Sequence, residues 1–310
     1  MTLDPDAEKV IALIEQANRP SPQSLSLSGA RDMFLGACTA LGGSGPDLFN
    51  IQDVQALAPG GHSIGLRMYR PTDGTNLDVC VYFHGGGWVL GDLETHDTLC
   101  RNLALATGGL VIAVDYRLAP EHPFPAGIDD AEAALSWVQA NVSGFDGNPD
   151  RISVAGDSAG GNLAAVVALS AKNNGWPPLR AQILIYPATD FSRDWPSYSD
   201  LAEQKPLTHA TMEWFGLQYM PEGADRSDWR ASPLLAPDHK GLPPALVVTG
   251  GYDVLRDEGA AYVAQLRASS VPVDHIHLAG QIHGFITMGM IIRDAQTITT
   301  KIAQFIARHP

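Results

Sequence analysis

Short, almost continuously apolar runs alternate with longer runs of helical periodicity along most of this chain of 310 residues. Continuous apolar runs are typical of parallel strands covered on both faces, and the periodic runs between them are typical of the covering helices. Two earlier runs alternate polar and apolar residues, which predicts antiparallel edge strands. The predicted strands are residues 50–58, 62–71, 77–83, 110–116, 151–156, 181–187, 245–251 and 273–279, and the clearest predicted helices are 129–142, 160–174 and 257–270. This order predicts an α/β fold with a mostly parallel central sheet and helices on both faces.

Two segments do not fit this alternation of strands and helices. Residues 1–48 contain a helical pattern that starts after Asp4 and Pro5, a suitable pair of N-cap and first-turn residues. Residues 190–230 contain a further helical pattern between two loops that hold prolines. We therefore expect a cap over the sheet, built from N-terminal helices in 1–48 and an insertion at 190–230. The main domain then comprises residues 49–189 and 231–310.

The composition narrows the choice of partners and location. The formal net charge is −14, whereas nucleic acids and anionic membranes bind basic surfaces, so we expect neither as a partner. No apolar run approaches the ~20 residues of a membrane span, and the N-terminus is acidic where a signal peptide is basic. The three cysteines show no paired spacing and predict neither a disulfide framework nor a metal site. These features favour a cytoplasmic protein.

The sequence "GDSAGG" (residues 156–161) follows a predicted strand and opens a predicted helix. A nucleophile elbow requires this strand–turn–helix context, with Ser158 on the strained turn. Glycines stand at positions 156 and 160, where side chains would collide with the elbow. Gly-x-Ser-x-Gly also arises by chance, but the context favours Ser158 as a nucleophile. The N–H of the next residue, Ala159, then becomes a donor to a developing oxyanion.

A nucleophilic serine needs a histidine base that is itself held by an acid, in the chain order serine, acid, histidine. Among the histidines after Ser158, His283 lies in the loop after the last predicted strand and is the best candidate. The alternative is a purely structural loop histidine. His275 and His277 share one face of a strand, but no third metal ligand accompanies them, so we favour a solvated strand face and expect no metal.

The acid of such a triad is expected at the C-terminal end of a strand. Asp253 directly follows the predicted strand 245–251. Asp257 and Glu258 fall in the first turn of the next predicted helix, where the helix dipole stabilises acidic residues in any protein. We therefore choose Asp253 as the acid.

Three consecutive glycines follow the predicted strand 77–83 in the sequence "HGGGW" (residues 84–88). Glycines let backbone N–H groups approach a substrate closely, and the second half of an oxyanion hole lies after this strand. A phosphate-binding loop is excluded because the Lys-Ser/Thr of a Walker sequence is absent. His84 does not fit the triad order, and we interpret it as a brace for the glycines.

Together these motifs resemble those of the hormone-sensitive lipase family of carboxylesterases. The resemblance runs from about Val79 to the end of the chain and, more weakly, through the cap, and it rests on "HGGGW", "DYRLAPEHPFPAGIDD", "GDSAGGNLAA", "SPLLAP", "YDVLRDEG" and "IHGF". It implies the α/β-hydrolase fold with a helical cap. The catalytic triad that it implies is Ser158, Asp253 and His283, with oxyanion-hole donors from Gly86, Gly87 and Ala159. Val254 departs from the proline that usually follows the acid.

The resemblance also implies an activity: hydrolysis of short- to medium-chain carboxylic esters through an acyl-enzyme, with no cofactor. Two alternatives stay open. One is an amidase or formamidase with the same triad, and the other is a catalytically silent ligand-binding protein on the same scaffold, against which the retained His283 argues. A homodimer also stays open, because dimers are common in the family.

The helix predicted within 207–220 supplies the expected substrate contacts. Met212 and Gly216 are four residues apart and share a helix face, with Phe215 beside them. Glycine inside a helix costs about 1 kcal/mol relative to alanine, so Gly216 suggests space that an acyl chain needs. A plain close contact between cap and sheet, or a helix boundary, is the alternative. Trp88 of "HGGGW" is the fourth predicted substrate contact.

Overall fold

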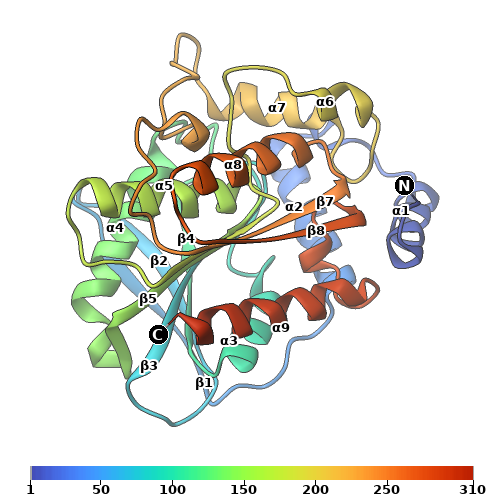
Figure 1. Ribbon diagram of the computed structural model, residues 1–310. Coiled ribbons are helices and arrows are strands. Elements are labelled where there is room, and N and C mark those ends of the chain that lie inside the picture. The colour runs from blue at the N-terminus through green and yellow to red at the C-terminus, as the bar shows by residue number, and fades with distance from the viewer. Residues whose placement is uncertain (1, 310) are drawn as a thin grey trace.

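A twisted sheet of eight strands crosses the molecule in the order β1-β2-β4-β3-β5-β6-β7-β8 in the computed structural model, which describes residues 2–309 (Figure 1). The strands are β1 (Asn50–Leu57), β2 (Ser63–Arg70), β3 (Leu77–Phe83), β4 (Leu110–Asp115), β5 (Gly147–Asp157), β6 (Ala181–Ile185), β7 (Ala245–Tyr252) and β8 (Val273–Ile282). β1 and β2 are antiparallel to their neighbours, and all other pairs are parallel. The predicted mostly parallel sheet is confirmed.

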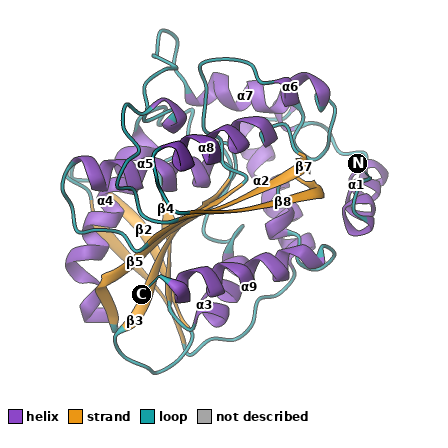
Figure 2. Cartoon of the chain, in the orientation of Figure 1, coloured by secondary structure: helices purple, strands orange, loops and turns teal. Residues whose placement is uncertain are grey.

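Helices cover both faces of the sheet (Figures 1 and 2). They are α1 (Pro5–Ala17), α2 (Leu27–Gly42), α3 (Asp97–Thr107), α4 (Ala126–Asn141), α5 (Ala159–Asn173), α6 (Pro196–Asp200), α7 (His209–Tyr219), α8 (Arg256–Ala268) and α9 (Arg293–Arg308), with short 3₁₀ turns at Pro22–Ser24, Val142–Phe145, Pro233–Leu235 and Phe285–Thr287. The sheet separates two apolar cores. On β3, Val81 belongs to the core under α4, α5 and α8, and the next residue, Tyr82, belongs to the core under α3 and α9. A strand buried on both faces needs such a continuous apolar run.

Two strands, β5 and β8, extend three or more residues beyond their predicted limits. β5 begins at Gly147, because this residue pairs with Leu77 across an irregularity in the ladder. β8 continues past Gly280 to Ile282, which pairs with Tyr252 after a register shift. Both extensions depend on pairing with a distant strand, and the extension of β8 carries the chain directly to His283.

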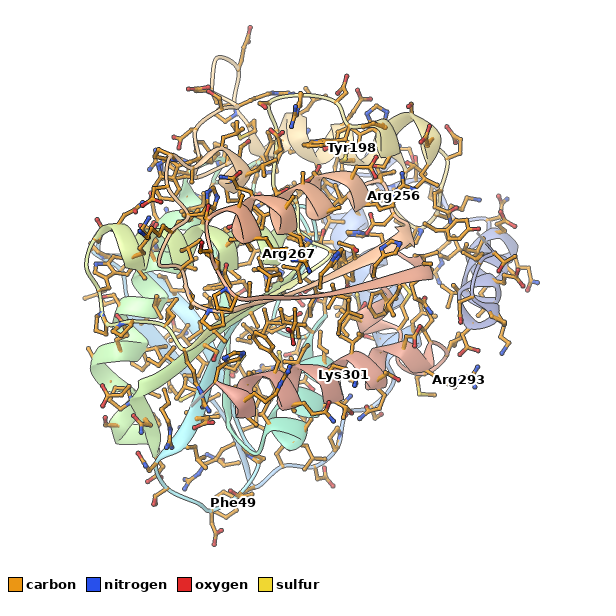
Figure 3. The ribbon with its side chains drawn as sticks, viewed as in Figure 1. Phe49, Tyr198, Arg256, Arg267, Arg293 and Lys301 are labelled. Carbon is orange, nitrogen blue, oxygen red and sulfur yellow. The ribbon has the colours of Figure 1, made fainter. Side chains whose placement is uncertain are left out.

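The N-terminal segment (residues 2–48) and the insertion (residues 190–230) contact one another. Thr211 of α7 donates a hydrogen bond to Gln23 at 3.3 Å, and Lys205 pairs with Glu15 at 3.5 Å. The insertion also lies over α8, where Figure 3 shows Tyr198 of α6 on the side of the molecule that carries Arg256. Within residues 2–309, no helix combines the length and the apolar character that crossing a bilayer demands.

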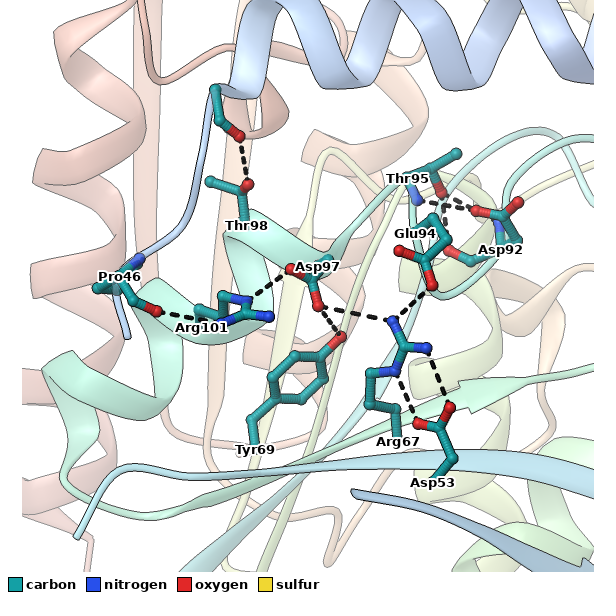
Figure 4. A network of polar contacts seen from close by, with 11 residues as sticks. Pro46, Asp53, Arg67, Tyr69, Asp92, Glu94, Thr95, Asp97, Thr98 and Arg101 are labelled. Carbon is teal, nitrogen blue, oxygen red and sulfur yellow. Dashed lines mark hydrogen bonds and ion pairs between the residues drawn. The ribbon is translucent and has the colours of Figure 1, made fainter. Parts of the chain in front are cut away.

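A surface network joins the antiparallel strands to the segment that leads into α3 (Figure 4). Arg67 of β2 pairs with Asp53 of β1 and with Glu94, in both cases at 2.7 Å. The hydrogen bond from Arg67 holds the pKa of the Asp53 carboxyl below its usual value. Arg67 thereby links β1 and β2 to the segment between the three glycines and α3.

Candidate active site

Ser158 occupies a strained turn between β5 and α5. Its backbone has φ 56° and ψ −118°, a conformation that costs a residue with a side chain about 1–3 kcal/mol. Its N–H donates to the carbonyl of Ile185 at 2.8 Å, which fixes the turn to β6. A Cβ on Gly156 would lie 2.2 Å from the carbonyl oxygen of Gly160, and one on Gly160 would lie 1.9 Å from that of Phe83. Glycine is therefore required at both positions.

Ser158, His283 and Asp253 form one hydrogen-bonded line. His283 Nε2 lies 2.9 Å from Ser158 Oγ, and His283 Nδ1 lies 2.8 Å from Asp253 Oδ2. Asp253 is fully buried, and its other oxygen accepts a hydrogen bond from the N–H of Leu255 at 2.9 Å. With the imidazole proton on Nδ1, Nε2 is free to accept the proton of the serine hydroxyl. Each of the three follows the end of a parallel strand: β5, β7 and β8.

The two alternative acids, Asp257 and Glu258, contact residues other than His283. Asp257 accepts a hydrogen bond from the N–H of Ser197 at 2.9 Å and pairs with Arg256 at 2.7 Å. Glu258 is buried rather than exposed in the helix turn, and it accepts hydrogen bonds from the N–H of Thr189 and the hydroxyl of Tyr198. Burial raises the pKa of Glu258 to about 8, against these two hydrogen bonds. The structure thus brings Asp253, and neither alternative, to His283.

The glycine loop (residues 84–91) lies beside Ser158. Gly86 has φ 123° and Gly87 has φ 62°, which favour glycine, and neither N–H donates a hydrogen bond within residues 2–309. Ala159 is the first residue of α5, whose first N–H groups have no partner inside the helix. Gly86, Gly87, Ser158 and His283 line one cavity of about 440 Å³. The site therefore combines a hydroxyl, a base and unpaired N–H donors around one space.

The ring of His84, the first residue of the glycine loop, contacts the backbone of the loop. Its Nδ1 donates to the carbonyl of Gly85 at 2.8 Å, and its ring stacks on Tyr116 at 4.3 Å between centroids. The Tyr116 hydroxyl donates to the His84 carbonyl at 2.7 Å. Burial, and the neighbouring His96, lower the pKa of His84 to about 4, so the ring is neutral at pH 7. These contacts suit the bracing role predicted for His84.

Asp157 and His96 were missed by sequence reasoning. The buried Asp157 carboxylate accepts hydrogen bonds from the Tyr82 hydroxyl at 2.7 Å and the N–H of Gly85 at 3.0 Å, and it pairs with His96 at 3.1 Å. Burial raises the pKa of Asp157, but His96 and Tyr82 outweigh burial and hold it below its usual value. Asp157 thereby ties the start of the glycine loop to the elbow. The signal was the acidic residue beside Ser158 in "GDSAGG".

All four predicted substrate contacts, Trp88, Met212, Phe215 and Gly216, line the cavity that holds Ser158. A Cβ on Gly216 would meet only the Phe191 ring, at 4.0 Å, so the helix leaves open space at this position. The N-terminal segment adds Phe34, Cys38 and Leu41 of α2, which sequence reasoning did not assign. Their signal was the apolar face of the predicted helices in 1–48.

His275 and His277 of β8 contact the neighbouring strand β7. His275 and His277 both lie 2.9 Å from Thr249 Oγ1. Among residues 2–309, no three His, Cys, Asp or Glu side chains are grouped so that they could hold a metal ion.

Comparison with known proteins assigns the family. Residues 80–287 match the alpha/beta hydrolase fold family. Carboxylesterase NlhH of Mycobacterium tuberculosis is 45% identical over 241 residues, which cover 76% of this chain and 75% of that protein. Ethyl acetate hydrolase of Pseudomonas putida is 38% identical over 100% of both chains.

Solved structures agree with this result. A hyperthermophilic esterase from the archaeon Pyrobaculum calidifontis superposes with a TM-score of 0.94 at 39% identity, covering 99% of this chain and 98% of its own. An ester hydrolase from the metagenome of Lake Arreo, in complex with a bipyridine phosphonate derivative, superposes with a TM-score of 0.96 at 38% identity and 99% coverage of both. The chain belongs to the alpha/beta hydrolase family and, within it, to the hormone-sensitive lipase-like carboxylesterases that its motifs resemble.

Proposed function

We propose that this protein is a serine carboxylesterase that hydrolyses short- to medium-chain carboxylic esters through an acyl-enzyme on Ser158. The observation that carries the proposal is the hydrogen-bonded line of Ser158, His283 and Asp253, of which Ser158 and His283 line the cavity. That the chain is a carboxylic ester hydrolase is supported by relatives named carboxylesterase, ethyl acetate hydrolase and esterase.

The proposed reaction has two halves. His283 Nε2 takes the proton of Ser158, the serine oxygen attacks the ester carbonyl, and the negative charge that forms on the carbonyl oxygen meets the N–H groups of Gly86, Gly87 and Ala159. The imidazolium, held by Asp253, then gives the proton to the leaving alcohol. In the second half, water takes the place of serine and releases the acid. In this scheme the three N–H groups are the oxyanion hole.

We further propose that residues 1–48 and 190–230 form the cap and that 49–189 and 231–310 form the catalytic domain. Support comes from the contacts between the two cap segments, Thr211 with Gln23 and Lys205 with Glu15, and from the cavity that both line.

The buried free thiols of Cys38, Cys80 and Cys100 support a location in the reducing cytoplasm. A homodimer remains an expectation from the family, and sedimentation of the purified protein tests it.

Turnover of p-nitrophenyl esters of graded acyl length, beside the matching anilide, tests the activity. We expect ester turnover that exceeds anilide turnover at every length. The change Ser158→Ala should lower kcat by about 10⁶, because the serine and the base act as one unit. A serine-directed phosphonate should add its mass to the peptide that contains Ser158.

The exposed Ser136 of α4 provides a matched control, and Ser136→Ala should leave turnover unchanged. A phosphonate adduct on another serine, or near-normal turnover by Ser158→Ala, contradicts the assignment of the nucleophile. Faster anilide than ester turnover identifies an amidase, and binding without any turnover identifies a silent binding protein.

A further inference from the structure

The middle of the glycine loop rests on α7 through two aromatic side chains. A Cβ on Gly87 would lie 2.2 Å from Phe215 Cγ and 2.4–2.5 Å from both Cδ atoms, so the Phe215 ring covers the bare face of Gly87. The next residue, Trp88, stacks on Tyr219 with ring centroids 4.5 Å apart and planes inclined by 7°. Phe215 and Tyr219 are one helical turn apart and share a face of α7. Consecutive loop residues thus contact consecutive turns of one helix.

The end of the loop is held by the other cap segment. Arg31 of α2 donates from Nε to the carbonyl of Val89 at 3.0 Å. The same guanidinium donates to the carbonyl of Ala119 at 3.2 Å and forms two hydrogen bonds of 2.8 Å with Glu121. The N–H of Ala119 in turn donates to the carbonyl of Trp88 at 2.9 Å. The rigid fork of an arginine makes such a contact directional.

The main domain holds the start of the loop. Asp157 holds the N–H of Gly85, and Tyr116 holds the carbonyl of His84. The unpaired N–H groups of Gly86 and Gly87 follow this start directly, and α7 contacts the loop at Gly87 itself. Donors to an oxyanion work only when they are aimed before the reaction begins.

We propose that Arg31, Phe215 and Tyr219 are positioning residues that aim the N–H groups of Gly86 and Gly87. The docking of the cap then sets the rate of the chemical step as well as the shape of the pocket. This inference rests on the proposed function, because it assigns the support of the proposed oxyanion hole.

Contact with the substrate is the competing role for residues of the cap. Phe215 lines the cavity, so its replacement alone cannot separate the two roles. Arg31 and Tyr219 do not belong to the cavity lining. Arg31 therefore gives the sharpest test, because it touches the loop and not the space for the substrate.

The experiment compares Arg31→Met, Tyr219→Leu and Phe215→Leu with two matched controls. Arg293→Met removes a different ion pair between the N-terminal segment and the main domain, Arg293 with Asp6 at 2.8 Å; Figure 3 shows Arg293 at the end of α9 near α1. Tyr219→Phe keeps the stacked ring and removes a hydroxyl that has no hydrogen-bond partner within residues 2–309. Far-UV circular dichroism and the Tm establish that each variant is folded.

The readouts are kcat and KM for p-nitrophenyl acetate and the inhibition constant of a methyl trifluoromethyl ketone. This ketone adds to a serine and leaves a tetrahedral oxyanion. Deletion of one oxyanion donor costs about 10²–10³ in kcat, and we expect a smaller loss of about tenfold when the donors are misaimed. KM should change less than twofold, the inhibition constant should rise in step with the loss of kcat/KM, and both controls should behave as the wild type.

Unchanged kcat in folded Arg31→Met and Tyr219→Leu overturns the inference. A higher KM with normal kcat, or a loss that grows with acyl length, assigns these residues to the pocket instead. A lower kcat with an unchanged inhibition constant also overturns it, because the oxyanion contacts are then intact. If Phe215→Leu does not fold, Arg31→Met decides alone. A wild type without turnover contradicts the proposed function, which is a separate result.

Discussion

The hydrogen-bonded line of Ser158, His283 and Asp253 and the glycine loop meet at one cavity, but they are built differently. Each member of the line follows the end of a parallel strand, so the sheet itself brings the three together. The glycine loop follows a strand only at its start, and its middle and end rest on α7 and α2. The position of the proposed nucleophile thus depends on the sheet, whereas the position of two proposed donors, the N–H groups of Gly86 and Gly87, depends also on helices outside it.

The largest effect is expected for a change in the hydrogen-bonded line that the sheet positions. Asp253→Asn keeps the shape of the acid but favours the wrong imidazole tautomer, so kcat should fall by about 10⁴ with the fold intact. Steady-state kinetics with a p-nitrophenyl ester measure the loss. Asp257→Asn is the matched control, because Asp257 contacts Ser197 and Arg256 rather than His283. Similar losses in both variants contradict the assignment of Asp253.

A loss of about 10²–10³ in kcat is expected when the glycine loop is distorted by Gly86→Ala. The added Cβ would lie 2.2 Å from the carbonyl oxygen of Leu90, at a φ of 123° that alanine avoids, so the loop must move. The same kinetic assay applies. Gly36→Ala is the control, because a Cβ there meets no atom within 4 Å. Near-normal kcat in Gly86→Ala shows that the loop does not hold the oxyanion.

The change Gly216→Leu separates the pocket from the loop. If the open space at Gly216 holds the acyl chain, a leucine there removes room for long chains only. Each buried methylene is worth about 0.8 kcal/mol, so butyrate should lose about tenfold in kcat/KM relative to acetate. Gln218→Leu on the same helix, outside the cavity lining, should leave the profile of acyl lengths unchanged. An unchanged profile in folded Gly216→Leu contradicts the contact, and a uniform loss indicates a misfolded cap.

The smallest effect is expected for Glu258, which holds the insertion (residues 190–230) to α8. Glu258 of α8 binds Thr189, where the insertion begins, and Tyr198 within it; the charges of Asp190 and Asp253 also face it. Its pKa is about 8 in the folded protein and about 4.5 when exposed, so the wild type loses stability as the pH rises between these values. Glu258→Gln cannot ionise and should avoid this loss.

The measurement is the Tm at pH 5, 7 and 9. The difference between Glu258→Gln and the wild type should become more positive from pH 5 to about 8 and stay level above it. Parallel curves contradict the raised pKa of Glu258. Kinetics with acetate esters near pH 6 should be unchanged, because Glu258 is protonated there in the wild type.

The difference between the hydrogen-bonded line and the glycine loop also explains which features could be predicted from the sequence. The limits of β3 were predicted to the residue, because an apolar run between loops is a local signal. Ser158, Asp253 and His283 were predicted for a similar reason, since each belongs to a motif at the end of a strand, and the structure brings the three together. The contact of Arg31 with Val89 joins residues 58 positions apart and leaves no periodic pattern. The end of β8 was also missed, because it depends on pairing with Tyr252.

The close contact between Gly87 and Phe215 constrains the order in which substitutions at these two positions can accumulate. The Phe215 ring fills the volume that a side chain at position 87 would need. A lineage that gains a side chain at position 87 must first shrink residue 215, because the new Cβ would otherwise overlap the Phe215 ring. The two positions, 128 apart in the chain, are therefore coupled, because a side chain at position 87 requires a smaller residue at position 215.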